Sequence, residues 1–184
     1  MSIQNKMEFK VMRNEDIDKF DKNNFDKVDH LHIDMSQSQV ESTKIAEILD
    51  RLSLTKQDRK FHLDLKKVKL DEIITQKIIK CLSSWTEMTN LHLHFSEVPL
   101  DEQIFMRLVK EGIVNLKNLT KIHLLLDNCN INNKMLTQIE HVIKSLPKLS
   151  NIRLNFKNNK LSEKDLMSIK TMINSYPSNE LLWE

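Results

Sequence analysis

The stretch Leu119–Ile131, LTKIHLLLDNCNI, decides the fold, because its spacing of apolar residues recurs through most of the chain. Within it Ile122, Leu124 and Leu126 alternate with other residues, as in a strand with one buried face. The equivalents of Ile122 in the other units are Leu31, Phe61, Leu91 and Ile152. Successive equivalents are 30, 30, 31 and 30 residues apart. A fixed period of this size predicts a stack of similar structural units.

Each unit has a second half with helical spacing. In the fourth unit Met135, Ile139 and Ile143 recur every four residues. Polar residues that suit a helix N-cap follow the last apolar strand or turn residue of units two to five: Asp71, Asp101, Asn132 and Ser162. Trp85 occupies a repeated apolar position and is expected in the core. Gly112 predicts that the helix of the third unit ends early or bends there.

Composition excludes several function classes. The chain of 184 residues fits one domain or a short repeat array and contains a single glycine. Loops that cradle phosphates need glycines, so nucleotide-binding functions are nearly excluded and no cofactor is expected. A net charge of +2 and a pI near 8.4 argue against a nucleic-acid partner.

The N-terminal residues lead us to expect no signal or transit peptide. No apolar run reaches the roughly 20 residues of a membrane span, and the acidic N-terminal region lacks a signal-peptide core. Cys81 and Cys129 form no spacing motif, which is typical of a reducing compartment without disulfides. We therefore expect a cytoplasmic protein or a subunit of a cytosol-facing assembly.

The predicted domain organisation has three parts. Residues 1–27 form an N-terminal cap, with a short strand around Phe9 and a helical turn over Asn14–Phe20. Residues 28–178 form five repeats. Residues 179–184 begin a sixth strand at Leu181–Trp183, with Leu182 placed 30 residues after Ile152. Its uncovered edge is expected to pair with another strand.

The repeated frame L-x-x-L-x-L-x-L-x-x-N-x-L resembles the leucine-rich repeat of the long, ribonuclease-inhibitor-like class. Each unit has an extra apolar residue in its strand, which resembles a variant of the repeat that is frequent in ciliated protozoa. In the five units this residue is Met35, Leu65, Phe95, Leu126 and Phe156. The resemblance covers about residues 28–178. It implies a right-handed α/β solenoid, with a parallel sheet on the concave face and helices on the convex face. It also implies protein binding in general terms and transfers no catalytic residue.

The position of the family's bridging asparagine or cysteine matches Cys129 and Asn159. The first three units have other residues there, namely Ser38, Val68 and Val98. An asparagine ladder is therefore incomplete, and the turns after the first three strands are expected to be less regular.

Histidines form the most informative polar pattern. One outward position of successive strands carries His32, His62, His92, His123 and then Arg153. The next outward position carries Asp34, Asp64, His94, Leu125 and Asn155. Because neighbouring strands lie about 4.8 Å apart, the first set predicts a histidine ladder across the sheet. We predict that these ten residues, on the concave face, and Leu181, Leu182 and Trp183, at the C-terminal edge, bind partners.

Three interpretations of the ladder stay open. In the first, repeat duplication alone copied a residue that tolerates an exposed strand. In the second, the ladder belongs to a partner-binding surface. A metal site is the third; its candidate ligands are His32, Asp34, His62, Asp64, His92 and His94. A ladder spreads ligands along a line, whereas a tetrahedral site needs them around a point, so we expect no metal. The rings should be mostly neutral at pH 7, and binding should change between about pH 5 and 7.

These patterns predict a non-enzymatic binding module or a structural subunit of a larger assembly. The histidines stand on open strands with no pocket wall or oxyanion donor implied, so no catalytic residue is assigned. The expected partner is a protein, within a multi-subunit complex or as a second copy bound through the C-terminal edge. The alternative from another class is a nucleic-acid accessory protein that uses lysines of the helical face.

Overall fold

A computed structural model describes residues 6–13, 16–17, 28–54 and 60–183. Within these residues seven strands form one sheet in the order of the chain. They are β1 (Lys6–Lys10), β2 (His30–Asp34), β3 (Lys60–Asp64), β4 (Asn90–His94), β5 (Lys121–Leu125), β6 (Asn151–Asn155) and β7 (Ser178–Leu182). Every neighbouring pair is parallel.

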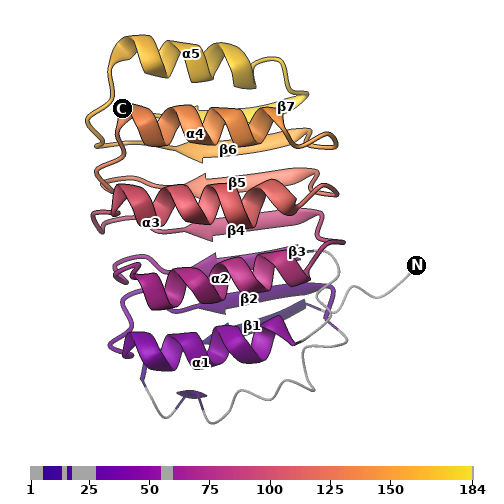
Figure 1. Ribbon diagram of the computed structural model, residues 1–184, viewed down its shortest axis with the longest axis vertical. Coiled ribbons are helices and arrows are strands. Elements are labelled where there is room, and N and C mark those ends of the chain that lie inside the picture. The colour runs from indigo at the N-terminus through magenta and orange to yellow at the C-terminus, as the bar shows by residue number, and fades with distance from the viewer. Residues whose placement is uncertain (1–5, 14–15, 18–27, 55–59, 184) are drawn as a thin grey trace.

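Helices connect the strands from β2 onward and cover one face of the sheet (Figure 1). The α-helices are α1 (Ser42–Ser53), α2 (Glu72–Ser84), α3 (Glu102–Arg107), α4 (Asn133–Lys144) and α5 (Glu163–Ile173). A π-helical turn, η3 (Leu108–Gly112), and a 3-10 turn, η4 (Ile113–Asn115), follow α3. The predicted α/β solenoid is confirmed. None of the helices in the described part of the chain is long and apolar enough to span a membrane.

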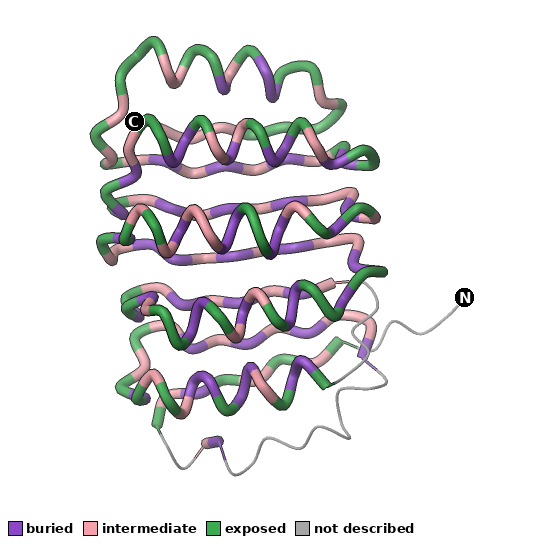
Figure 2. Tube along the Cα trace, viewed as in Figure 1, coloured by how far each residue is buried: buried purple, intermediate pink, exposed green. Residues whose placement is uncertain are grey.

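The core lies between the sheet and the helices. Strands β2 to β6 share one pattern, in which the second and fourth residues are buried and the others are half-buried. Figure 2 shows this alternation along the strands. Trp85 is 1% exposed, and its ring meets that of Phe61 edge-on at 4.8 Å between centroids. Trp85 is therefore a core residue, as its repeated position predicts.

The four predicted helix caps are confirmed. The side chains of Asp71, Asp101, Asn132 and Ser162 each accept a hydrogen bond from the backbone N–H three residues later. The donor–acceptor distances are 2.9, 3.0, 3.0 and 3.2 Å in that order. Each cap pairs one of the N–H groups that the first helical turn leaves without an intrahelical partner.

The helix of the third unit changes geometry near Gly112, as expected. Its α-helical part ends at Arg107, and the π-helical turn that follows ends at Gly112. A Cβ on Gly112 would lie 3.1 Å from Leu82 Cδ1 of the neighbouring helix, so the glycine permits close packing. This unit contains the one spacing of 31 residues, and a π-helical turn absorbs one extra residue in a helix.

The turns after the strands are more regular than expected. The same turn position has a left-handed φ between 55° and 65° in all five units; it is Gln37, Lys67, Glu97, Asn128 and Asn158. The first four of these N–H groups donate to a backbone carbonyl of the next unit at 2.8 to 3.0 Å. The expectation of less regular turns in the first three units is therefore wrong, because backbone hydrogen bonds join the turns without an asparagine.

Asn159 adds side-chain bonds to this arrangement between the last two units. Its Oδ1 accepts from the N–H groups of Cys129 and Ile131 at 3.0 and 2.8 Å. Its Nδ2 donates to the carbonyl of Leu126 at 2.8 Å. The Cys129 thiol in turn donates to the carbonyl of Phe95 at 3.2 Å. The matched asparagine and cysteine thus bridge neighbouring units as the resemblance implies.

The sheet ends in β1 on one side and β7 on the other, and both strands can be compared with the predicted ones. Strand β1 places Phe9 opposite Ile33, so the expected short N-terminal strand is confirmed, while most of the turn predicted over Asn14–Phe20 lies outside the described residues. Strand β7 begins at Ser178, and Leu182 pairs with Asn155 rather than with Ile152. The predicted register of the last strand is therefore wrong by three residues. Ser178 lies 27 residues after its partner Asn151, because α5 and the connection after it are together three residues shorter than α4 and its connection.

Candidate functional site: the open face of the sheet

Every second strand residue faces away from the helices, and these residues make up the open face. The starting row is Lys6, His30, Lys60, Asn90, Lys121, Asn151 and Ser178. The central row is Glu8, His32, His62, His92, His123, Arg153 and Glu180. The end row is Lys10, Asp34, Asp64, His94, Leu125, Asn155 and Leu182. The register brings together all ten residues predicted for the concave face.

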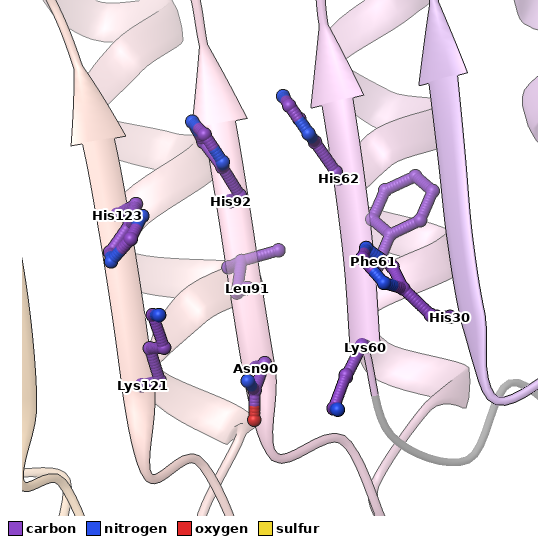
Figure 3. Close-up of a pocket in the computed structure, with 9 residues that line it drawn as sticks. All are labelled: His30, Lys60, Phe61, His62, Asn90, Leu91, His92, Lys121 and His123. Carbon is purple, nitrogen blue, oxygen red and sulfur yellow. The ribbon is translucent and has the colours of Figure 1, made fainter. Parts of the chain in front are cut away.

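Three histidines of the central row form a stack. The rings of His32 and His62 are parallel within 3°, with centroids 3.9 Å apart. The rings of His62 and His92 are parallel within 6° at 3.8 Å. His123 meets His92 edge-on at 5.1 Å (Figure 3). The predicted ladder is confirmed, and we call His32, His62 and His92 the histidine stack.

The side chains of the histidine stack are largely shielded from solvent, although they lie on the open face of the sheet. The side chain of His32 is only 18% exposed, and the Nε2 atoms of all three rings are buried. No group among the described residues forms a hydrogen bond with these Nε2 atoms. The rings have little exposed surface because neighbouring imidazoles cover one another's faces.

Burial keeps the inner imidazoles neutral. It lowers the pKa of His62 to about 4, with the neighbouring His32 adding to the effect. It lowers the pKa of His92 to about 3, with His62 and His123 adding. Neutral rings at pH 7 agree with the prediction. The predicted window of pH 5 to 7 is too high for these two rings, because burial disfavours the charged form more than repulsion at the surface would.

Polar side chains of the end row are held by their neighbours. His94 Nδ1 and Asp64 Oδ2 are joined at 3.0 Å. Burial raises the pKa of Asp64, but hydrogen bonds from His94 and from the backbone of Lys66 outweigh it and lower the pKa overall. Asp34 accepts from the Ser36 hydroxyl at 2.6 Å and lies 3.4 Å from Lys10 Nζ. These side chains are therefore fixed in place on the face.

The remaining predicted members extend the surface beyond the stack. Arg153 Nε lies 3.0 Å from Glu180 Oε2, a pair that follows from the register of β7. Asn155 Nδ2 donates to Asp127 Oδ1 at 3.1 Å. Leu125 is a half-buried apolar residue among these polar neighbours. The face thus has mixed polarity from one end to the other.

Sequence reasoning missed the starting row. A hollow of about 160 Å³ lies between it and the central row; it is lined by His30, Lys60, Phe61, His62, Asn90, Leu91, His92, Lys121 and His123 (Figure 3). The members of the starting row on β2 to β5 can be found in the sequence, because each stands two residues before a histidine of the ladder, at the preceding outward position. The row gives a weak sequence signal because it mixes lysine, histidine and asparagine, whereas the ladder repeats one residue type.

The metal alternative finds no support in this geometry. In the ranges that the structure describes, no three histidine, cysteine, aspartate or glutamate side chains come together as metal ligands.

The two cysteines are poor nucleophiles, because burial raises the pKa of Cys81 well above its usual range and that of Cys129 to about 11. That the protein is not an enzyme stays a prediction.

The three residues predicted at the C-terminal edge line one hollow, but each contacts a different part of the protein. Leu181, Leu182 and Trp183 are half-buried and border a hollow of about 180 Å³ with Lys157. Leu181 packs against the core, and Leu182 belongs to the open face. The Trp183 ring lies 4.7 Å from Lys170 Nζ of α5. Their role in partner binding stays a prediction.

Comparisons with known proteins show the fold alone. No protein-family model matches the chain, and no curated protein matches it either. The tropomodulin C-terminal domain of Caenorhabditis elegans is similar over 93% of this chain and 84% of its own, with 12% identity and a TM-score of 0.55. This likeness is consistent with a leucine-rich-repeat-like α/β solenoid.

Two further solved structures have lower TM-scores. Actin-binding site 2 of leiomodin-1 aligns with 93% of this chain and 76% of its own, at 13% identity and a TM-score of 0.39. A Bacteroides fragilis protein aligns with 98% of this chain and 74% of its own, at 10% identity and a TM-score of 0.32. Neither likeness is strong enough to carry an argument about function.

Proposed function

We propose that this protein is a non-enzymatic protein-binding module that holds its partner on the open face of the sheet. The observation that carries the proposal is the histidine stack, which presents in-register imidazoles across neighbouring strands. We further propose that the units belong to the ribonuclease-inhibitor-like class of leucine-rich repeats, in the variant that resembles proteins of ciliated protozoa.

The physical basis is preorganisation. Side chains that are already ordered lose less conformational entropy when a partner binds. The stacked rings hold one another, and the Asp64–His94 and Arg153–Glu180 pairs restrain their neighbours. The inner rings, His62 and His92, are neutral, so a partner that covers them does not incur the desolvation cost of a charge.

A matched pair of substitutions tests this surface. Leu125→Lys adds a charge to the open face, and Ile73→Lys adds the same charge on α2, where Ile73 is 46% exposed. Tagged chains would be used to capture partners from lysate of the source cells, after circular dichroism has confirmed that each variant is folded. We expect Leu125→Lys to lose a partner that the natural chain and Ile73→Lys retain. Equal capture by all three chains, or loss with Ile73→Lys alone, would contradict the proposal.

We also propose a second contact beside β7, through which the protein joins a larger assembly or a second copy. Met167 is 57% exposed there and lines a hollow with Trp183, Leu166 and Glu163. Sedimentation of the natural chain and of Trp183→Ser tests this contact. A concentration-dependent increase in mass that the substitution abolishes supports self-association, whereas an assembly that Trp183→Ser leaves intact argues against this site.

A further inference from the structure

Lysines of the starting row recur on every second strand from β1 to β5. Lys6 lies on β1, Lys60 on β3 and Lys121 on β5. The strands between them carry His30 and Asn90 at the same register position. Because neighbouring strands are about 4.7–4.9 Å apart, successive lysines are spaced by about 9.4–9.8 Å along the row.

No carboxylate belongs to this row. Its seven described members are three lysines, one histidine, two asparagines and one serine. Within the described residues no carboxylate forms an ion pair with Lys121, and Lys121 is the second cause, after burial, of the lowered pKa of His123. The pKa of His30 is lowered by burial and then by Lys6 and Lys60. The starting row therefore has a positive potential.

The other two rows contain the acidic groups, and these already have partners. Glu8 lies beside His32, Asp34 beside Lys10, Asp64 beside His94, and Glu180 beside Arg153, at 3.5, 3.4, 3.0 and 3.0 Å. Positive charge is thus concentrated at the starts of the strands, where the hollow between Lys60 and Lys121 opens. Asn90 lines that hollow between the two lysines and adds an amide N–H₂ donor.

We propose that the starting row binds an acidic segment of a protein partner, in polyproline-II conformation, whose carboxylates recur at every third residue. The proposal rests on the open-face binding argued above and specifies the chemistry of the partner. A polyproline-II helix has three residues per turn and rises about 3.1 Å per residue. Every third side chain therefore lies on the same side of the segment, about 9.3 Å from the last. That spacing matches the lysine-to-lysine distance across two strands.

The spacing favours this conformation over a β-strand. In a β-strand, residues three apart point to opposite faces, and residues two apart lie about 6.6–6.8 Å apart along the strand. Neither matches the row. Carboxylates would meet the ammonium groups of Lys60 and Lys121, and the residues between them would lie over Asn90 and the imidazoles of His62 and His92.

Synthetic peptides test the proposal directly on the full chain. The probe is acetyl-EPPEPPEPPE-amide, which places four glutamates three residues apart in a polyproline-II former. One control peptide has glutamine in place of each glutamate, and another has the same composition with the four glutamates adjacent. Binding would be measured by fluorescence anisotropy at low salt and at about 0.5 M salt, where screening shortens the Debye length to a few ångströms.

We expect the spaced glutamate peptide to bind more tightly than both controls and to lose affinity at high salt. Lys60→Gln with Lys121→Gln should weaken its binding by about tenfold, and Lys121→Gln alone by about threefold. The matched control is Lys110→Gln with Lys164→Gln, which removes the same charge from exposed helical positions and should leave binding unchanged. Circular dichroism confirms that each variant folds.

Several outcomes would overturn the proposal. These are equal binding of the spaced and adjacent peptides, equal weakening by the helical control, or tighter binding of a single-stranded oligonucleotide of the same charge. If the peptide fails to bind while Leu125→Lys still abolishes capture of a cellular partner, the open face remains a binding surface and only its proposed acidic ligand is rejected. If Leu125→Lys has no effect on that capture, the proposed function itself fails.

Discussion

Buried neutral histidines should make the protein less stable in mild acid. An unfolded histidine has a pKa of 6.5, whereas folding lowers that of His62 to about 4 and that of His92 to about 3. Between these values the unfolded chain binds more protons than the folded one. The stability is therefore fully present above about pH 6.5 and is lost as the pH falls toward 4.

The magnitude follows from these shifts. At pH 5 proton linkage lowers the free energy of unfolding by about 2 kcal/mol for each of the two rings. Because the rings are partly open to solvent, we halve the sum and expect the free energy of unfolding to fall by about 2 kcal/mol between pH 7 and pH 5. The lowered pKa values of His30 and His123 add to the loss. Carboxylates contribute little in this range, since their pKa values in the unfolded chain are near 4.

Urea unfolding monitored by tryptophan fluorescence measures this change, because Trp85 is in the core. At pH 7 the His92→Gln variant should be less stable than the natural chain because its packing is altered. Between pH 7 and pH 5, however, its free energy of unfolding should fall by only about half as much as that of the natural chain. His141→Gln, at an exposed position of α4, is the matched control and should retain the full pH dependence. A free energy of unfolding that is equal at pH 7 and pH 5, or an unchanged pH dependence in His92→Gln, would refute the reasoning.

Three further predictions concern the core and the turns. Trp85→Ala should lower the free energy of unfolding by about 3–5 kcal/mol in urea titrations, because it leaves a cavity; a loss below about 1 kcal/mol would contradict its core position. Asn159→Ala should cost about 2–3 kcal/mol, since the backbone N–H groups of Cys129 and Ile131 lose their acceptor; an unchanged urea midpoint would show that they find another. Cys81 should react with a thiol reagent in native protein at pH 8 at less than about a hundredth of its rate in urea, because burial raises its pKa; equal rates would argue against its burial.

The repeat period and local chemistry predicted most of the fold. Alternating apolar residues identified which strand residues are buried, because period two leaves only one face for the core. The caps, such as Asp71 and Asn132, were predictable because a cap depends on a few neighbouring residues. Gly112 marked the irregular helix for the same local reason.

Features that depend on contacts between units were harder to predict. The register of β7 differs because α5 and the connection after it are together three residues shorter than α4 and its connection, and counting a constant period cannot detect this. The first turns are regular because backbone groups bond across units, and backbone groups leave no sequence signal. The ladder was predicted from spacing, but stacking and burial of its rings depend on side-chain packing between strands. The starting row escaped notice because its members share charge and register, not residue type.

Site-specific photo-cross-linking tests the central claim most directly, namely that a protein partner lies on the open face. A photoreactive phenylalanine analogue would replace Leu125 on that face or Ile73 on α2 in otherwise natural chains. We predict a cross-linked partner from position 125 and none from position 73. Cross-links formed only from position 73 would place the partner on the helices and contradict the account.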